Sequence, residues 1–317
     1  MSNYGLGSQG AEVNRIQTRL KQLGNYAGRV DGIYAVSTET AVKAFQTAHS
    51  IGVTGVVGPQ TWGALFPGET MPPPIVDHPL IYRCLALTGS YETDSLIPDC
   101  FAGLSGDFDG QGISFGVLQW NFGQGSLPPL LIEMDTKHSN TLRNVFGSNY
   151  TTFQSIIRAS KTQQMAWARS IQIKNRLNEP WRSQFKALGA TKEFQDIEVL
   201  HATQVFQRAK TMCHEYGVFT ERAVALMFDI VTQNGSISAA TKKVISTDFT
   251  HIPASGTPET KEVARLRIIA NRRAEAAKPQ WIEDVRARKL TIANGEGQVH
   301  GNKYTLASQY GLRLVTF

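Results

Sequence analysis

The sequence predicts a mainly α-helical protein, in which a small three-helix domain precedes a larger helix-rich domain with one short β-hairpin. Apolar residues recur at spacings of three and four through most of the chain, which is the period of an amphipathic helix. A cluster of prolines near residue 70 separates two such regions, and a glycine-rich stretch at residues 101–125 interrupts the second one. These three observations give the fold class and the order of its parts.

The composition is that of a globular protein with two domains. Hydrophobic residues make up 41% of the 317 residues and charged residues 18%. No apolar run approaches the roughly 18 residues of a membrane span and no Sec-type signal is visible, so we expect no integral membrane segment. Three cysteines are too few for a disulfide framework, and no CxxC or HxxxH spacing occurs, so we expect neither a metal nor a cofactor. The net charge of +6 suits an anionic partner, but no nucleic-acid motif accompanies it.

The proline cluster predicts the domain boundaries. Four of the 13 prolines lie at positions 67, 72, 73 and 74, and polyproline is stiff, extended and excluded from helices and sheets. We therefore expect a small domain at residues 1–66, a linker at 67–78 and a large domain at 79–317.

The small domain should contain three helices and an internal duplication. The apolar spacing from Val13 to Leu20 predicts a first helix that Gly24 ends. A second helix should follow Ser37, and a third should begin at Pro59, a residue suited to the first helical turn. Two similar glycine turns, at residues 24–34 and 51–58, follow the first two helices and indicate a repeated unit.

These residues resemble the peptidoglycan-binding type-1 domain. The matching positions extend over nearly all of residues 5–66 and include Asp31-Gly-x-Tyr34-x-x-x-Thr38 and Gly58-x-x-Thr61-Trp62. Ala35 departs from the glycine usual after the aromatic residue, which affects one turn. The resemblance implies a groove for the peptide stem of the bacterial wall, and Asp31, Tyr34 and Thr38 are its expected lining residues.

From residue 79 onward, apolar periodicity predicts helices at residues 81–88, 151–176, 192–216, 221–233, 257–273 and 281–290. The glycine-rich stretch predicts a hairpin beside a cleft.

Glycoside hydrolysis needs two carboxyl groups, one to protonate the leaving oxygen and one to activate water or attack the sugar. The candidates near the hairpin are Glu92, Asp94, Asp99, Asp107 and Asp109. Glu92 ends an apolar helix, where the protonated form of an acid is favoured, and Asp109 lies on the flexible side and should stay ionised.

A second resemblance, to the lysozyme-like superfamily and most closely to the bacterial chitosanases, rests on three motifs. They are Glu92 with Asp109-Gly-Gln-Gly-Ile-Ser114-Phe-Gly116 seventeen positions later, Gly116-Val-Leu-Gln119-Trp-Asn121, and a helix with Asp229 that ends in Gln233-Asn234-Gly235. Where the chitosanase pattern has a threonine and a histidine, this sequence has Ser114 and Asn234. The resemblance implies an inverting mechanism with Glu92 as general acid, Asp109 as general base and Ser114 positioning water. It further implies that the substrate is bound by Gln119, Asn121, Asp229 and Asn234.

Several alternatives remain open. Asp107 competes with Asp109 as the base, and Glu92 alone would suffice for a lytic transglycosylase. A chitosanase differs only in substrate. Pro98-Asp-Cys100 resembles the start of papain-like wall peptidases, but the sequence offers Cys100 no obvious histidine partner, and a packed cysteine is the preferred interpretation. Most arginines at residues 265–288 should be solvated, although one, with Arg273 as the candidate, could turn inward toward a carboxylate.

The sequence thus predicts a monomeric, two-module N-acetylmuramidase that binds peptidoglycan and hydrolyses its glycan strands. The architecture is typical of a bacteriophage endolysin, which would accumulate in the host cytoplasm and act on the periplasmic wall. A wall-binding protein without activity is the non-enzymatic alternative, and the presence of both Glu92 and Asp109 argues against it.

Overall fold

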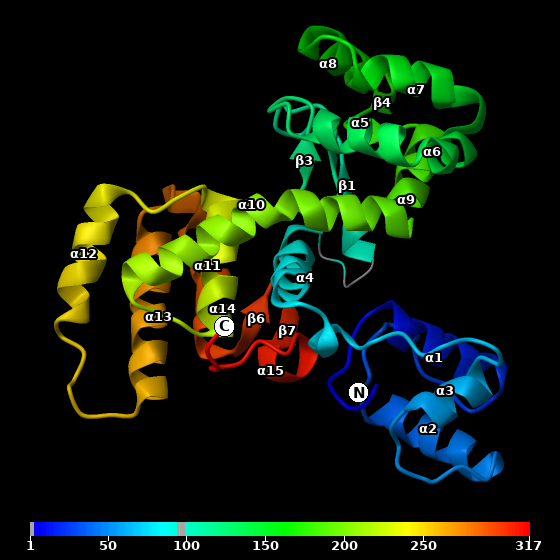
Figure 1. Cartoon of the computed structure of the whole chain (residues 1–317), viewed down its shortest axis with the longest axis horizontal. Coiled ribbons are helices and arrows are strands. Elements are labelled where there is room, and N and C mark those ends of the chain that lie inside the picture. The colour runs from blue at the N-terminus through cyan, green and yellow to red at the C-terminus, as the bar shows by residue number, and fades with distance from the viewer. Residues whose placement is uncertain (1–2, 94, 96–98) are drawn as a thin grey trace. The chain divides into compact units, whose positions relative to one another are not determined.

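The computed structural model describes residues 3–93, 95 and 99–317, and it is mainly α-helical, as predicted (Figure 1). Asp94, one of the candidate carboxylates, lies outside the described residues. The α-helices are α1 (Ala11–Gln22), α2 (Val36–Ala48), α3 (Pro59–Leu65), α4 (Leu80–Thr93), α5 (Leu127–Lys137), α6 (Ser139–Phe146), α7 (Tyr150–Ile157), α8 (Lys161–Ser170), α9 (Trp181–Gly189), α10 (Lys192–Tyr216), α11 (Glu221–Asn234), α12 (Ala239–Phe249), α13 (Pro258–Glu275), α14 (Ile282–Asn294) and α15 (Leu306–Gln309). Among the described residues, no helix is both long and apolar enough to cross a bilayer.

The described strands are short, and each pairs with a strand next to it in the sequence. β1 (Leu104–Ser105), β2 (Ser114–Phe115) and β3 (Trp120–Asn121) form an antiparallel sheet in that order. β4 (Gln172–Ile173) pairs with β5 (Arg176–Leu177), and β6 (Glu296–Val299) pairs with β7 (Asn302–Thr305). The helix predicted over 151–176 is therefore wrong in extent, because the capping box of Ser160 starts a new helix and a tight hairpin begins at Gln172.

The chain forms two compact units, one of Met1–Leu87 with Phe206–Phe317 and the other of Thr88–Val205. This division differs from the predicted domains at 1–66 and 79–317, because the continuous helices α4 and α10 each belong partly to one unit and partly to the other. Residues 4–65 nevertheless have a hydrophobic cluster of their own, which contains Phe45, Trp62 and Leu65. Within the predicted linker, Ile75–Asp77 form a single 3-10 turn, and Pro72 accepts a hydrogen bond of 2.9 Å from the hydroxyl of Tyr4.

The predicted duplication in the N-terminal region is visible in its buried polar groups. Gln17 of α1 accepts hydrogen bonds from the amides of Asp31 and Gly32 and donates one of 3.1 Å to Thr38. Gln46 of α2 repeats this pattern with Thr54, Gly55 and Thr61. Both glutamines are fully buried and satisfy the backbone of the loop that follows their helix, so the two repeats use the same buried hydrogen-bond arrangement.

The second unit has an aromatic core beside its three-stranded sheet. Phe115 of β2 packs against Phe185 of α9 and Phe194 of α10, with ring centroids 5.0 and 5.2 Å apart, and Phe146 stacks on Phe153 at 3.9 Å. Edge-to-face and stacked pairs of this kind add roughly 0.5–1.5 kcal/mol each to the burial of the rings. The sheet is therefore anchored by its apolar face, and its loops are presented from a rigid base.

The C-terminal part of the first unit packs α11, α13 and α14 together. Asp229 of α11 is fully buried and forms ion pairs with Arg288, at 2.7 Å, and Lys289, both on α14. Arg83 at the start of α4 pairs with Glu221 at the start of α11 at 2.6 Å. These buried charges link helices that are distant in sequence and fix which faces of α11 and α14 meet.

Candidate active site

The C-terminal end of α4 lies against the glycine-rich sheet within the second unit. A Cβ atom on Gly103 would lie 2.4 Å from Thr93 Cγ2 and 2.8 Å from Gln119 Nε2, and one on Gly89 would lie 2.2 Å from Val117 Cγ2. Only glycine permits these approaches, so the sequence lets the helix end and the β2–β3 turn come into direct contact. Glu92 is the penultimate residue of α4 and is partly exposed beside this contact.

The end of α4 and the sheet therefore lie together, as predicted. The candidate carboxylates Asp107 and Asp109 are on the loop between β1 and β2. Asp109 is exposed, and its Oδ1 accepts a hydrogen bond of 3.1 Å from the amide of Gln111 in its own loop. This short local contact leaves the carboxylate on the solvent side, where a base can reach a water molecule.

Asp107, the competing base, is held by other groups. Its Oδ2 accepts a hydrogen bond of 2.8 Å from Arg169 Nε of α8, and its Oδ1 accepts one of 2.7 Å from the amide of Gly112. The hydrogen bonds from Arg169 and Gly112 hold the pKa of Asp107 below its usual range. A carboxylate that is hydrogen-bonded at both oxygens and has a lowered pKa is a weaker base than a free one, so Asp107 is suited to holding this loop.

The turn from Gly116 to Gln119 is stabilised from beneath by Glu198 of α10, a residue that the sequence reasoning missed. Glu198 is fully buried, and its Oε1 accepts a hydrogen bond of 2.8 Å from the amide of Val117. A Cβ on Gly116, whose φ is +85°, would lie 2.1 Å from the same oxygen. Burial raises the pKa of Glu198 well above its usual range. The sequence holds one signal that could have found Glu198. It lies four residues from both Phe194 and Ala202, which places it on the apolar stripe of α10.

The other predicted residues of the hairpin are close together but differ in accessibility. Ser114 of β2 is 9% exposed and faces Asn121 across the β2–β3 ladder. The amide group of Gln119 donates to Gly116 O at 2.9 Å, and its oxygen accepts from Ser105 at 2.9 Å. The side-chain oxygen of Asn121 accepts from the amide of Gln124 at 2.7 Å, so it is committed to the turn after β3. Sugar contact by Asn121 stays a prediction.

The structure corrects the prediction for Asp229 and assigns Asn234 to a pocket. No part of the Asp229 side chain is accessible, because Arg288 and Lys289 enclose it, so it cannot touch a substrate directly. Asn234, at the end of α11, lines a pocket of about 520 Å³ in the first unit, and Arg273 lines the same pocket. The arginine that turns inward to a carboxylate is therefore Arg288 rather than Arg273.

Two of the three expected wall-binding residues belong to the core of the N-terminal region. Tyr34 is 1% exposed and its hydroxyl donates to Gly55 O at 2.9 Å, while Thr38 is fully buried against Gln17. The prediction that these two side chains line a groove is thus wrong, since both satisfy internal hydrogen bonds. Asp31 is exposed, although its Oδ1 accepts hydrogen bonds from Gln17 and Ile33.

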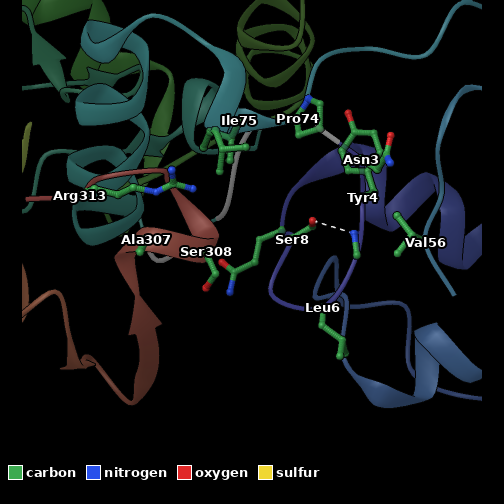
Figure 2. A pocket seen from close by; sticks show the side chains of 13 residues that line it. Asn3, Tyr4, Leu6, Ser8, Val56, Pro74, Ile75, Ala307, Ser308 and Arg313 are labelled. Carbon is green, nitrogen blue, oxygen red and sulfur yellow. Dashed lines mark hydrogen bonds between the residues drawn. The ribbon is translucent and has the colours of Figure 1, made fainter. Parts of the chain in front are cut away.

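A pocket of about 330 Å³ in the first unit is lined by N-terminal residues that include Tyr4 and Leu6, by Pro74 and Ile75, and by Ser308 (Figure 2). Ser8 Oγ, at its edge, accepts a hydrogen bond of 3.0 Å from the amide of Gly5. None of the expected wall-binding residues is among the residues that line it. This pocket therefore adds no support to the predicted peptide groove.

The peptidase alternative is not supported by the environment of its cysteine. Cys100 is fully buried in the 3-10 turn Asp99–Ala102, and burial raises the pKa of its thiol well above the ordinary value. A nucleophilic cysteine requires an accessible thiolate. Cys100 is a packed core residue, as the preferred interpretation of the sequence held.

Comparison with known proteins identifies the N-terminal region. Residues 9–65 match the family described as a putative peptidoglycan binding domain, which confirms the first resemblance. The chain is 33% identical over 63 residues to N-acetylmuramoyl-L-alanine amidase CwlM of Mycobacterium tuberculosis, an alignment that covers 20% of this chain. This chain spans only 16% of the length of that relative.

Solved chitosanases are similar to a larger share of the chain. A native chitosanase from Bacillus subtilis has 17% identity and a TM-score of 0.46 over 71% of this chain and 94% of its own. A GH46 chitosanase from Gynuella sunshinyii in complex with chitotetraose has 13% identity and a TM-score of 0.47 over 70% of this chain and 94% of its own. At these values the similarities assign no activity to this chain.

Proposed function

We propose that this protein is a wall-binding glycoside hydrolase that cleaves the glycan strands of peptidoglycan as an N-acetylmuramidase. The observation that carries the proposal is the contact between the glycine-rich sheet and the end of α4, where Glu92 is the penultimate residue; the loop between β1 and β2 of that sheet carries Asp109. The match of residues 9–65 to a peptidoglycan-binding family supports the polymer as substrate.

In the proposed reaction Glu92 protonates the glycosidic oxygen as the bond to the anomeric carbon breaks. Asp109 removes a proton from a water molecule, whose oxygen attacks the anomeric carbon from the opposite face. The product has an inverted anomeric configuration, and both carboxyl groups return to their starting states after proton exchange with solvent. This chemistry requires the two carboxyl groups to lie about 6.5–9.5 Å apart. The Ser114 hydroxyl is proposed to orient the water.

The wall-binding module supports this activity by tethering. A binder linked to a catalyst raises the local concentration of the catalyst on an insoluble polymer, without new contacts at the active site. Within this proposal the protein is an endolysin, which is held in the host cytoplasm until release and then acts on the periplasmic wall. Its function there is host cell lysis.

The test is a Glu92→Gln variant compared with wild type on purified murein. Loss of clearing in a zymogram, with unchanged co-sedimentation with murein, supports Glu92 as the acid and the N-terminal region as the binder. Clearing by the variant at the wild-type rate rejects the assignment.

A chitosanase is the second candidate, because the motifs around Glu92 and Asp109 most closely resemble that family. Release of reducing sugar from chitosan at a rate above that from murein would favour it. A lytic transglycosylase, in which Glu92 acts alone, is the third candidate and differs in the chemistry of its products.

A further inference from the structure

Phe108 is an aromatic side chain held in solvent on the loop between β1 and β2, next to the proposed base Asp109. It is 71% exposed, the largest value among the exposed large hydrophobic side chains that the structure describes. A phenylalanine in water adds little to the core, so the fold gains little from it and its ring is open to a ligand. We infer that Phe108 binds substrate by stacking its ring on a sugar ring of the glycan strand, next to the bond that is cleaved. The inference rests on the proposed function and adds a binding residue to the same site.

The loop is fixed on the side that precedes Phe108. Gly106 packs against the β4–β5 hairpin so closely that a Cβ atom on it would lie 2.0 Å from Asn175 O and 2.4 Å from Gln172 Oε1. Gln172 Oε1 also accepts a hydrogen bond of 2.9 Å from the amide of Asp107. The residue before Phe108 is therefore joined to the hairpin through its backbone.

The far side of the loop is fixed as well. The amide of Gly112 donates a hydrogen bond of 2.7 Å to Asp107 Oδ1, and Arg169 of α8 donates one of 2.8 Å to Asp107 Oδ2. A Cβ atom on Gly112 would lie 3.0 Å from Met165 Sδ of the same helix. The two ends of the loop are thus joined to each other and to α8. Because the loop that carries Phe108 is held in this way before a substrate arrives, binding costs little conformational entropy.

The ring of Phe108 lies within reach of a sugar at Asp109. Consecutive Cα atoms are about 3.8 Å apart, and both residues are exposed. A glycan whose anomeric carbon faces Asp109 therefore brings that sugar or its neighbour beside Phe108. The face of an aromatic ring carries partial negative charge, which attracts the C–H groups on the face of a pyranose ring. Murein and chitosan share these C–H groups, so the contact raises the affinity for either polymer and does not choose between them.

Leu200 of α10 provides a matched control in the same unit. Single exposed apolar side chains are common on protein surfaces, and Leu200 is one of them, with 52% of its surface exposed. It lies about 200° around the helix from the fully buried Glu198 and is not part of the loop. Leu200→Ala therefore removes exposed apolar surface without changing the surroundings of Asp109.

The experiment measures binding of two tetrasaccharides, the peptide-free murein glycan and the glucosamine tetramer, to the full-length Glu92→Gln protein by calorimetry. Neither contains stem peptide, the ligand that the wall-binding family implies for the N-terminal region. For the tetrasaccharide that binds more tightly, adding Phe108→Ala should weaken binding by about tenfold, the factor expected when most of a phenylalanine side chain is no longer buried on binding. Phe108→Trp should bind at least as tightly as the parent. Phe108→Leu, which is apolar but has no flat face, should bind less tightly, and Leu200→Ala should bind as the parent does.

Two further measurements separate substrate binding from a structural role. Since the ring is exposed, the Phe108 variants should keep the melting temperature of the parent. In the protein with Glu92 intact, Phe108→Ala should raise KM for the polymer that is cleaved and change kcat less. A structural role would instead lower the melting temperature and kcat together.

Equal affinities of Phe108→Ala and the parent would overturn the inference, as would full affinity in Phe108→Leu or a loss in Leu200→Ala equal to that in Phe108→Ala. Failure of the parent to bind either tetrasaccharide would overturn it too. Clearing of murein by Glu92→Gln at the wild-type rate would instead reject the catalytic assignment and leave this binding comparison standing.

Discussion

Arg169 Nε donates a hydrogen bond of 2.8 Å to Asp107 Oδ2 and so links α8 to the loop between β1 and β2. Asp109, only two residues farther along this loop, accepts its hydrogen bond from the loop backbone instead. The two carboxylates therefore have different surroundings. Asp107 holds the loop in place, and Asp109 is presented on it.

Replacement of these carboxylates should separate catalysis from loop structure. Asp109→Asn removes the proposed base and should lower kcat by about 10²–10⁴-fold without changing the melting temperature, because among the described residues the Asp109 side chain bonds to the backbone of its own loop. Asp107→Asn and Arg169→Gln should share a smaller loss of kcat and a lower melting temperature, since each removes one end of the same ion pair. Steady-state kinetics on solubilised murein and calorimetry check both. A larger loss for Asp107→Asn than for Asp109→Asn would exchange their roles.

The buried ion pairs of Asp229 should make the protein sensitive to acid. Burial opposes ionisation of Asp229, but the charges of Arg288 and Lys289 outweigh it and lower the pKa to about 2. A carboxylate with a lowered pKa stabilises the fold fully above its unfolded pKa of about 4, and this stabilisation disappears as the pH falls toward 2. At neutral pH, Asp229→Asn should cost about 3–5 kcal/mol, because two buried cations lose the negative charge that lies between them.

Melting temperatures of wild type and Asp229→Asn, measured from pH 6 to pH 2, check this prediction. The difference between the two proteins should shrink as the pH falls. Asp284→Asn, which removes a carboxylate that is partly exposed, is the control and should show a smaller effect. A difference that stays constant across the range would contradict the proposed coupling.

Glu198 should act as a neutral acid that positions the turn carrying Gln119. Glu198→Gln keeps an acceptor for the amide of Val117 and should retain kcat, whereas Glu198→Ala leaves that amide unpaired and should cost about 1–3 kcal/mol and lower kcat. Because the pKa of Glu198 is raised in the fold, its stabilising effect is complete below about pH 4 and decreases as the pH rises toward the raised value. The stability of wild type relative to Glu198→Gln should therefore decrease with rising pH. If the stabilities of the two proteins depended on pH in the same way, Glu198 would not be the titrating group.

Cys100 should be dispensable for the chemistry. Its thiol is buried and unreactive, so Cys100→Ala should leave the rate of murein clearing within about twofold of wild type, at a cost in stability typical of a small core truncation. Iodoacetamide should not inhibit the native protein. Loss of murein clearing both in Cys100→Ala and after iodoacetamide treatment would support the peptidase alternative.

Helix periodicity and turn glycines predicted most of the fold. α10, α11 and α14 lie close to the expected ranges because their apolar spacing is regular and their ends carry ordinary stop signals. The division into units could not be predicted in this way, since it depends on which helices pack together. Residues 206–317 belong to the same unit as residues 1–87 because contacts such as that between Arg83 and Glu221 join positions far apart in sequence.

The candidate site was predictable only in part, for a related reason. The motifs indicated the helix end at Glu92 and the loop of Asp109, but a motif does not show whether a polar side chain faces outward. Tyr34, Thr38 and Asp229 all matched the families that the sequence resembles, yet they are buried and serve the fold. Glu198 lacks any motif, and its position beneath the turn emerges only from its burial in three dimensions.

The most direct test of the central claim is the mass of the fragments released from purified murein by wild type and by Asp109→Asn. Two-carboxylate hydrolysis adds one water to each cleaved bond, so wild type should release fragments with reducing muramic acid ends and Asp109→Asn should release almost none. Anhydro ends that persist at full yield in Asp109→Asn would contradict the account, because they would show that Glu92 acts without a second carboxylate.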